Sequence, residues 1–146
     1  MRVPRALEVA QHEAAHIVVG VALGLRLRSA SARPWASEHD GYCWFPLPPR
    51  RRTWADAVTG AAGVAWERAA HPADADTEGY QRFDWAELLG AVPSLHDAET
   101  CVRAAAALLR TLGPEHARVT RALLERDLTG ADLTALAHGE PLSADE

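Results

Sequence analysis

The chain has 146 residues, of which 48% are hydrophobic and 24% are charged, and its formal net charge is −5. A chain of this length and composition can bury a hydrophobic core without disulfides, so we expect a single domain over residues 1–146. The acidic balance gives no electrostatic reason to expect nucleic acid or an anionic membrane as a partner.

The first predicted helix has apolar residues at helical spacing from Leu7 to Val21. Pro4 suits its first turn and Gly24 is a plausible stop. The next two stretches favour strands, because Leu25–Arg33 partly alternates and Gly41–Leu47 is aromatic and is followed by prolines. The prolines place the second strand at an edge of the sheet.

A second helix is expected from a capping box at Thr53 and Asp56 to about Ala70. Its segment "TGAAG" contains Gly60 and Gly63. Each glycine costs a helix interior about 1 kcal/mol relative to alanine, which is reasonable if another backbone must come close there.

After a polar loop at His71–Gly79, four more helices are expected at about Phe83–Val92, Leu95–Leu112, Glu115–Leu128 and Ala131–Ala137. Ser94 and Asp97 form a second capping box. Gly113 is expected to end one helix and Pro114 to begin the next. Residues 139–146 are expected to be frayed. The predicted fold is α+β and mainly helical, with a two- or three-stranded sheet and a C-terminal helical bundle.

The localisation expected from the sequence is cytoplasmic. Cys43 and Cys101 are isolated and lie in no CxxC spacing, so neither a disulfide framework nor a cysteine zinc site is expected. The longest apolar run, Ile17–Leu25, is far shorter than the roughly 20 residues that span a bilayer. No signal sequence precedes this run.

The segment "QHEAAHIVVG" contains an HExxH motif formed by His12, Glu13 and His16. On a helix, positions 12 and 16 lie about 40° apart and one turn along the axis, so both imidazoles can bind one ion. A zinc ion bound there would activate water, and Glu13, beside the ligands, would accept the proton. The motif also arises by chance in roughly a few per cent of such chains. Here, however, it lies in an amphipathic helix where a buried glutamate is costly without a function.

A third ligand is needed, and it must come from further along the chain. Structural zinc sites usually have four protein ligands and favour cysteine, so two histidines with a base indicate catalysis. The longer HExxHxxGxxH pattern is absent, because Val19 and Ala22 occupy its last two fixed positions. The candidate ligands are acidic residues or histidines downstream: Glu67, His71, Asp74, Asp76 and Asp84.

The order of motifs resembles the peptidase domain of the FtsH-type ATP-dependent zinc metalloproteases. The similar segments are "HEAAHIVVGVALG", "GYCWFPLP", "TGAAGVAWER" and "FDWAELLGA", over roughly residues 8–112. The resemblance implies that His12, His16 and Asp84 bind zinc and that Glu13 is the base. Asp84 lacks the asparagine and threonine that flank the aspartate in the family, so the four rivals remain open.

The function that we expect is a zinc-dependent metallopeptidase that hydrolyses peptide bonds of flexible or unfolded polypeptides. The sequence has no ATPase module, so the ATP-driven unfolding of the family is not expected. A peptide substrate could add as a strand beside "GYCWFPL". Two alternatives are a regulatory protease with a single partner protein and an idle zinc-binding interaction module.

Other polar and aromatic residues have simpler interpretations. His39 and His96 each precede an aspartate and are expected on the solvated surface. The tryptophans at positions 54, 66 and 85 are expected to pack helices together, whereas Tyr42 and Trp44 belong to the core or to a peptide groove. His116 and His138 receive no role.

Overall fold

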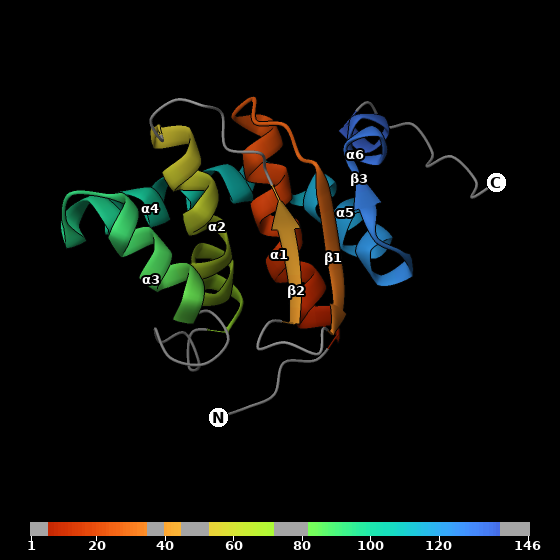
Figure 1. The fold of residues 1–146 in the computed structure, drawn as a ribbon, viewed down its shortest axis with the longest axis horizontal. Helices are drawn as coiled ribbons and strands as arrows, with labels where there is room; N and C mark the ends of the chain where they lie inside the picture. Colours follow the sequence, from red (N-terminus) through yellow and green to blue (C-terminus); the bar gives the residue numbers. More distant parts are fainter. Residues whose placement is uncertain (1–5, 35–39, 45–52, 72–81, 138–146) are drawn as a thin grey trace.

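The computed structural model describes residues 6–34, 40–44, 53–71 and 82–137 (Figure 1). Its elements, in chain order, are α1 (Ala6–Ala22), β1 (Ser29–Pro34), β2 (Asp40–Trp44), α2 (Trp54–Ala70), α3 (Arg82–Ala91), α4 (Leu95–Thr111), α5 (Gly113–Glu125), β3 (Leu128–Thr129) and α6 (Gly130–Ala137). The expected α+β, mainly helical class is confirmed. No helix within the described ranges combines the length and apolarity needed to cross a membrane.

Helix α1 occupies the centre of the fold (Figure 1). It packs against α2 on one side and α5 on another, and β1 and β2 lie across it. Residues 12–20 are all buried. Ala10, Ala14 and Ala15 are fully buried, and their small side chains let the neighbouring elements approach closely. Because every side of this helix is covered, the polar residues of its HExxH motif lie inside the protein.

The sheet has three strands in the order β2-β1-β3, and both pairs are antiparallel. Ala30 of β1 pairs with Cys43 of β2 and with Leu128 of β3. The two expected strands are therefore confirmed in shorter form, and β2 lies at the expected edge. The sheet covers the side of α1 that neither α2 nor α5 occupies.

The expected helix boundaries at three points are confirmed by their capping contacts. Asp56 Oδ2 accepts hydrogen bonds from the Thr53 backbone N–H at 2.6 Å and hydroxyl at 2.9 Å. At the start of α4, the Asp97 backbone N–H donates to Ser94 Oγ over 3.1 Å. Gly24 follows the end of α1 with a φ of +84°, a left-handed conformation that glycine adopts without strain. These local signals could be identified from sequence because each involves residues close together in the chain.

The C-terminal segment corrects the expected helix at Glu115–Leu128. Helix α5 ends at Glu125, and Leu128 belongs to β3, where its side chain is 1% exposed. Thr129 and Asp132 then form a third capping arrangement, with the Thr129 backbone N–H donating to Asp132 Oδ2 over 2.9 Å. Pairing of β3 with β1 is a long-range interaction that helical spacing cannot predict.

Two aromatic assignments also change. Trp54 is 56% exposed, so the expectation that it packs helices together is wrong. Trp66 and Trp85 do pack against the core. His116, which received no role, is 5% exposed and stacks on Trp66 with ring centroids 4.0 Å apart. Its Nε2 lies 2.9 Å from the Gln11 carbonyl oxygen, which ties α5 to α1.

Several expectations concern residues outside the described ranges. These are the role of Pro4, the surface position of His39, the loop after His71, the side chains of Tyr42 and Trp44, His138 and the frayed tail at 139–146. His96 is exposed, as expected.

The burial of His116 predicts a specific pH dependence of stability. Burial lowers the pKa of His116 and outweighs the hydrogen bond to Gln11, which raises it. The unfolded chain therefore binds a proton below about pH 6.5 that the folded chain does not, and stability falls as the pH falls. For metal-free protein, we expect wild type to lose more unfolding free energy between pH 7.5 and 5.5 than His116→Gln loses. Urea denaturation measures this difference, and an equal or smaller loss in wild type would contradict it.

Candidate metal centre

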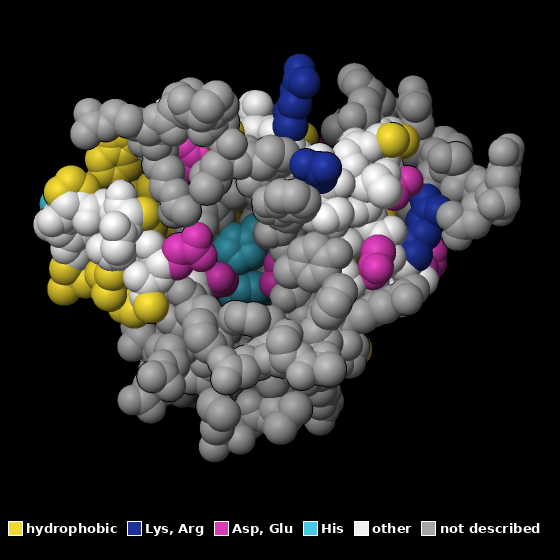
Figure 2. Space-filling view, in the orientation of Figure 1, with side chains coloured by type: hydrophobic (Ala, Val, Ile, Leu, Met, Phe, Trp, Pro, Cys, Tyr) yellow, Lys and Arg dark blue, Asp and Glu magenta, His cyan; other side chains and the backbone are white. Residues whose placement is uncertain are grey.

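A hollow in one face of the molecule leads to a histidine cluster. Figure 2 shows histidine surface at its floor, with acidic side chains beside it. His12 and His16 of α1 are only 4% and 6% exposed, whereas the side chain of Asp84 from α3 is 26% exposed. The cluster is therefore enclosed by protein around the imidazoles and reaches solvent on the Asp84 side.

The two imidazoles of the HExxH motif turn the same ring nitrogen toward each other. His12 and His16 are one helical turn apart on α1, and their Nε2 atoms are 3.3 Å apart. Two nitrogens bound to one tetrahedral zinc at about 2.0–2.1 Å would be separated by about 3.3–3.4 Å. The spacing of the two donor atoms thus fits a shared metal ion.

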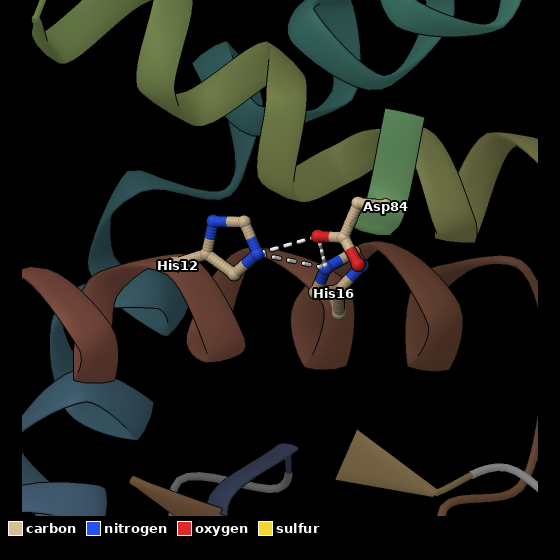
Figure 3. A group of neighbouring side chains, drawn as sticks. All are labelled: His12, His16 and Asp84. Atoms are coloured by element: carbon tan, nitrogen blue, oxygen red, sulfur yellow. Dashed lines mark hydrogen bonds and ion pairs between the residues drawn. The ribbon is translucent and has the colours of Figure 1, made fainter. Parts of the chain in front are cut away.

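Asp84 adds a carboxylate to this pair from the first turn of α3 (Figure 3). Its Oδ2 lies 2.5 Å from His12 Nε2 and 2.9 Å from His16 Nε2. The three side chains form a group whose candidate ligand atoms all lie within 4.8 Å of one another. Two imidazole nitrogens and a carboxylate oxygen are ligands typical of a transition metal, so the group could hold a metal ion.

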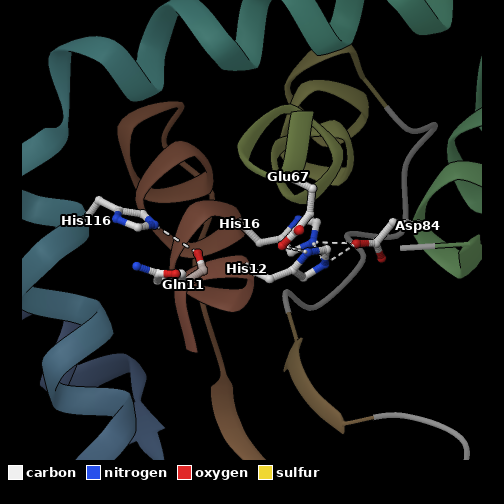
Figure 4. Close-up of polar contacts among 6 residues, drawn as sticks. All are labelled: Gln11, His12, His16, Glu67, Asp84 and His116. Carbon is white, nitrogen blue, oxygen red and sulfur yellow. Dashed lines mark hydrogen bonds and ion pairs between the residues drawn. The ribbon is translucent and has the colours of Figure 1, made fainter. Parts of the chain in front are cut away.

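Acceptors from α2 face the other ring nitrogen of each histidine. Figure 4 shows one of them, Glu67, reaching from α2 toward the imidazoles. His16 Nδ1 donates to the Thr59 carbonyl oxygen over 2.7 Å. His12 Nδ1 lies 3.7 Å from Glu67 Oε1, and Glu67 is 3% exposed. A carbonyl or carboxylate at Nδ1 favours the tautomer whose Nε2 lone pair is available to a metal. Helix α2 therefore orients both histidines toward the same point.

Gly63 leaves the space that the imidazoles fill. A Cβ atom at this position would be 2.5 Å from His12 Nε2 and 2.6 Å from His16 Nε2. At Gly60, a Cβ would meet nothing within 4 Å. The expectation that another backbone approaches both glycines is therefore wrong, because the close neighbours are histidine rings and only Gly63 has them.

The charges of the cluster are strongly coupled in the metal-free protein. Burial alone would lower the pKa of His12, but the charge and hydrogen bond of Asp84 raise it to about 10. The same competition between burial and Asp84 raises the pKa of His16. Burial acts to raise the pKa of Asp84, and the two histidines reverse this and hold it well below its usual range. In the absence of a metal, the protonated imidazoles donate hydrogen bonds to the Asp84 carboxylate.

Glu13 lies next to the cluster without belonging to the group of three. It is 7% exposed, and its charge acts to raise the pKa of both His12 and His16. Glu13 follows His12 directly in α1, so it is buried in the same turn of the helix. The arrangement resembles that of a base held beside a metal rather than on it.

The rival candidates for the third ligand occupy other positions. Glu67 lies on the Nδ1 side of His12, and His71, at the end of α2, is not part of the group. Asp74 and Asp76 lie outside the described residues. The orienting role of Glu67 was missed by sequence reasoning, although a signal existed: Thr59, Gly63 and Glu67 recur every fourth residue and so share one face of α2.

The glycine pair of α2 provides a matched test of the centre. We expect Gly63→Ala to lower metal affinity at least about tenfold, because its methyl group must displace imidazoles that are held by Thr59 and Glu67. Gly60→Ala should bind metal as wild type does and gain up to about 1 kcal/mol of stability from its higher helix propensity. Competition titration with a chromophoric chelator and urea denaturation measure the two effects. Equal metal affinity in both variants would refute the packing described for Gly63.

Metal binding should release protons. An imidazole must be neutral to bind a metal ion. The pKa of His12 is about 10 in the metal-free form, so at pH 7 its ring is positively charged and must lose one proton before it can bind. Apparent zinc affinity should therefore rise with pH between about 6 and 8 and fall as the pH is lowered. Calorimetry at pH 7 in two buffers with different ionisation enthalpies should show release of about one proton or more per ion. A binding enthalpy independent of the buffer would contradict this prediction.

Comparison of the chain with protein-family models and with curated proteins finds no match. The functional inference therefore depends on the residues and geometry of the centre.

Proposed function

We propose that this protein is a zinc-dependent metallopeptidase that hydrolyses peptide bonds in flexible or unfolded polypeptides. The observation that carries the proposal is the convergence of Asp84 Oδ2 with the two HExxH imidazoles, since these residues are 68 and 72 positions apart in the chain. The resemblance to the FtsH-type peptidase domain is part of this proposal, because it is the source of the role assigned to Asp84.

Zinc is the proposed ion because the donor set is two histidines and one carboxylate with a glutamate beside them. Three protein ligands leave a position open, as in catalytic rather than structural zinc sites. Zinc bound there would supply Lewis acidity toward water and the substrate carbonyl. A two-histidine, one-carboxylate set also suits iron, so metal analysis must measure both elements.

Glu13 would act as the general base and then the general acid in this reaction. Its carboxylate would take a proton from the attacking water and pass it to the nitrogen of the leaving amine. The burial of Glu13 beside two histidines favours this role over an idle binding module, because an ionised carboxylate is costly to bury without compensation.

The substrate would bind along β2 as an added antiparallel strand. In the described part of the sheet, β2 has a single neighbour, β1, and it lies along α1. A peptide hydrogen-bonded to the outer edge of β2 would be held by its backbone, whatever its side chains. An extended substrate is the reason for proposing flexible polypeptides. A protease with one dedicated partner would use the same contacts.

Substitution of Glu13 separates catalysis from metal binding. Glu13→Gln keeps the side-chain shape and all three ligands, so zinc content should stay near one per chain while casein hydrolysis falls about 10²-fold or more. Asp84→Asn and His16→Ala should lose zinc and activity together, because each weakens or removes a ligand. Elemental analysis of protein purified without chelator gives the zinc and iron content.

The matched control is Glu125→Gln at the exposed end of α5. It also removes one negative charge, but at a position distant in the sequence from the HExxH motif. It should leave both zinc content and hydrolysis unchanged. Cleavage by Glu13→Gln at the wild-type rate would show that Glu13 is not the base. Wild-type protein without a stoichiometric transition metal would overturn the whole proposal.

A further inference from the structure

Helix α3 is attached to the rest of the protein through few buried side chains. Of its side chains that the structure describes, those of residues 84–91, only Leu88 is buried, at 2% exposure. Residues 86, 87, 89 and 90 are exposed, and Leu89 is 41% exposed. The helix has ten residues and packs mainly on α2. A helix this short is marginal by itself in water, so its position depends on its contacts.

Trp85 of α3 packs half-buried against the core and also contacts Arg68 of α2. The Arg68 guanidinium lies 5.0 Å from the centre of the Trp85 ring. The same Arg68 forms an ion pair with Glu99 of α4 at 2.8 Å, and both side chains are about one-third exposed. Partly exposed cation–π contacts and ion pairs contribute little to stability. The contact between Arg68 and Trp85 therefore adds little to the docking of α3 on α2.

Asp84 is the residue of α3 that reaches the histidine pair. In the metal-free state its carboxylate is held by hydrogen bonds to His12 and His16. Coordination of all three side chains to one ion would replace these hydrogen bonds with ligand bonds, whose free energy adds directly to the free energy of folding. Because Asp84 is the one member of the group that does not lie on α1, that free energy acts on the docking of α3.

We infer that a metal ion bound by His12, His16 and Asp84 holds α3 on α2 more firmly than the hydrogen bonds alone, and that α3 opens locally more often when the metal is removed. The inference rests on the proposed metal site but not on catalysis. Bound metal then keeps α3, and with it Asp84, at the centre.

Hydrogen exchange measured by mass spectrometry tests this inference on the full chain. Zinc-loaded and metal-free protein are compared at one pH, and bound zinc is quantified independently by elemental analysis. Zinc should slow exchange of peptides covering residues 82–91 at least about tenfold. Peptides from α5, residues 113–125, should change much less. A general gain in stability would instead slow both regions alike.

Two variants sharpen the comparison. In Asp84→Asn, added zinc should leave exchange of α3 fast, because the ligand that connects α3 to the ion is weakened. In Leu88→Ala, exchange of α3 should be faster in both states and should still slow on zinc addition, because the packing is reduced and the ligand is kept. If wild type binds one zinc and exchange in α3 does not slow more than in α5, the locking of α3 is refuted and the metal site stands. If no metal binds, both fail.

Discussion

The space that Gly63 leaves on α2 is the constraint on which the rest of the site depends. Without a side chain at this position, the imidazoles of His12 and His16 occupy the space between the helices. The same face of α2 also presents the Thr59 carbonyl and the Glu67 carboxylate to the Nδ1 sides of the two rings. The missing methyl group at Gly63 therefore determines where the rings fit, and the contacts of α2 at Nδ1 hold them in that position. Asp84 can then complete the group from a third helix.

Charge is the second feature that makes the arrangement consistent with a cation. Glu13 and Glu67 are buried, and Asp84 is partly buried against the two histidines. Burying a carboxylate is costly unless positive charge or hydrogen bonds compensate for it. In the metal-free protein the compensation includes protons on the imidazoles, which is why the pKa of His12 rises to about 10. A divalent cation would supply the same positive charge and leave the histidines neutral.

Sequence reasoning succeeded where the determinants are local. The capping residues of α2 and α4, the stop at Gly24 and the edge position of β2 could all be identified from neighbouring residues. The HExxH spacing was sufficient to place His12 and His16 on one face of α1. Asp84 could be proposed only through a resemblance, because no local rule connects it to α1. The strand β3 and the contact of His116 with Gln11 were missed, since both are formed by segments about a hundred positions apart.

The separation of 72 residues between His12 and Asp84 has a consequence for the order of folding. Two histidines one turn apart are brought together as soon as α1 forms, whereas the carboxylate joins them only after a long loop has closed. Closing such a loop costs conformational entropy before any contact compensates for it, so distant pairs form late. The centre is therefore assembled in two stages, an early pair of imidazoles and a late carboxylate. A chain that is still folding would therefore carry the imidazole pair without the complete group of three, and the full affinity for a metal ion would appear only with the final tertiary structure.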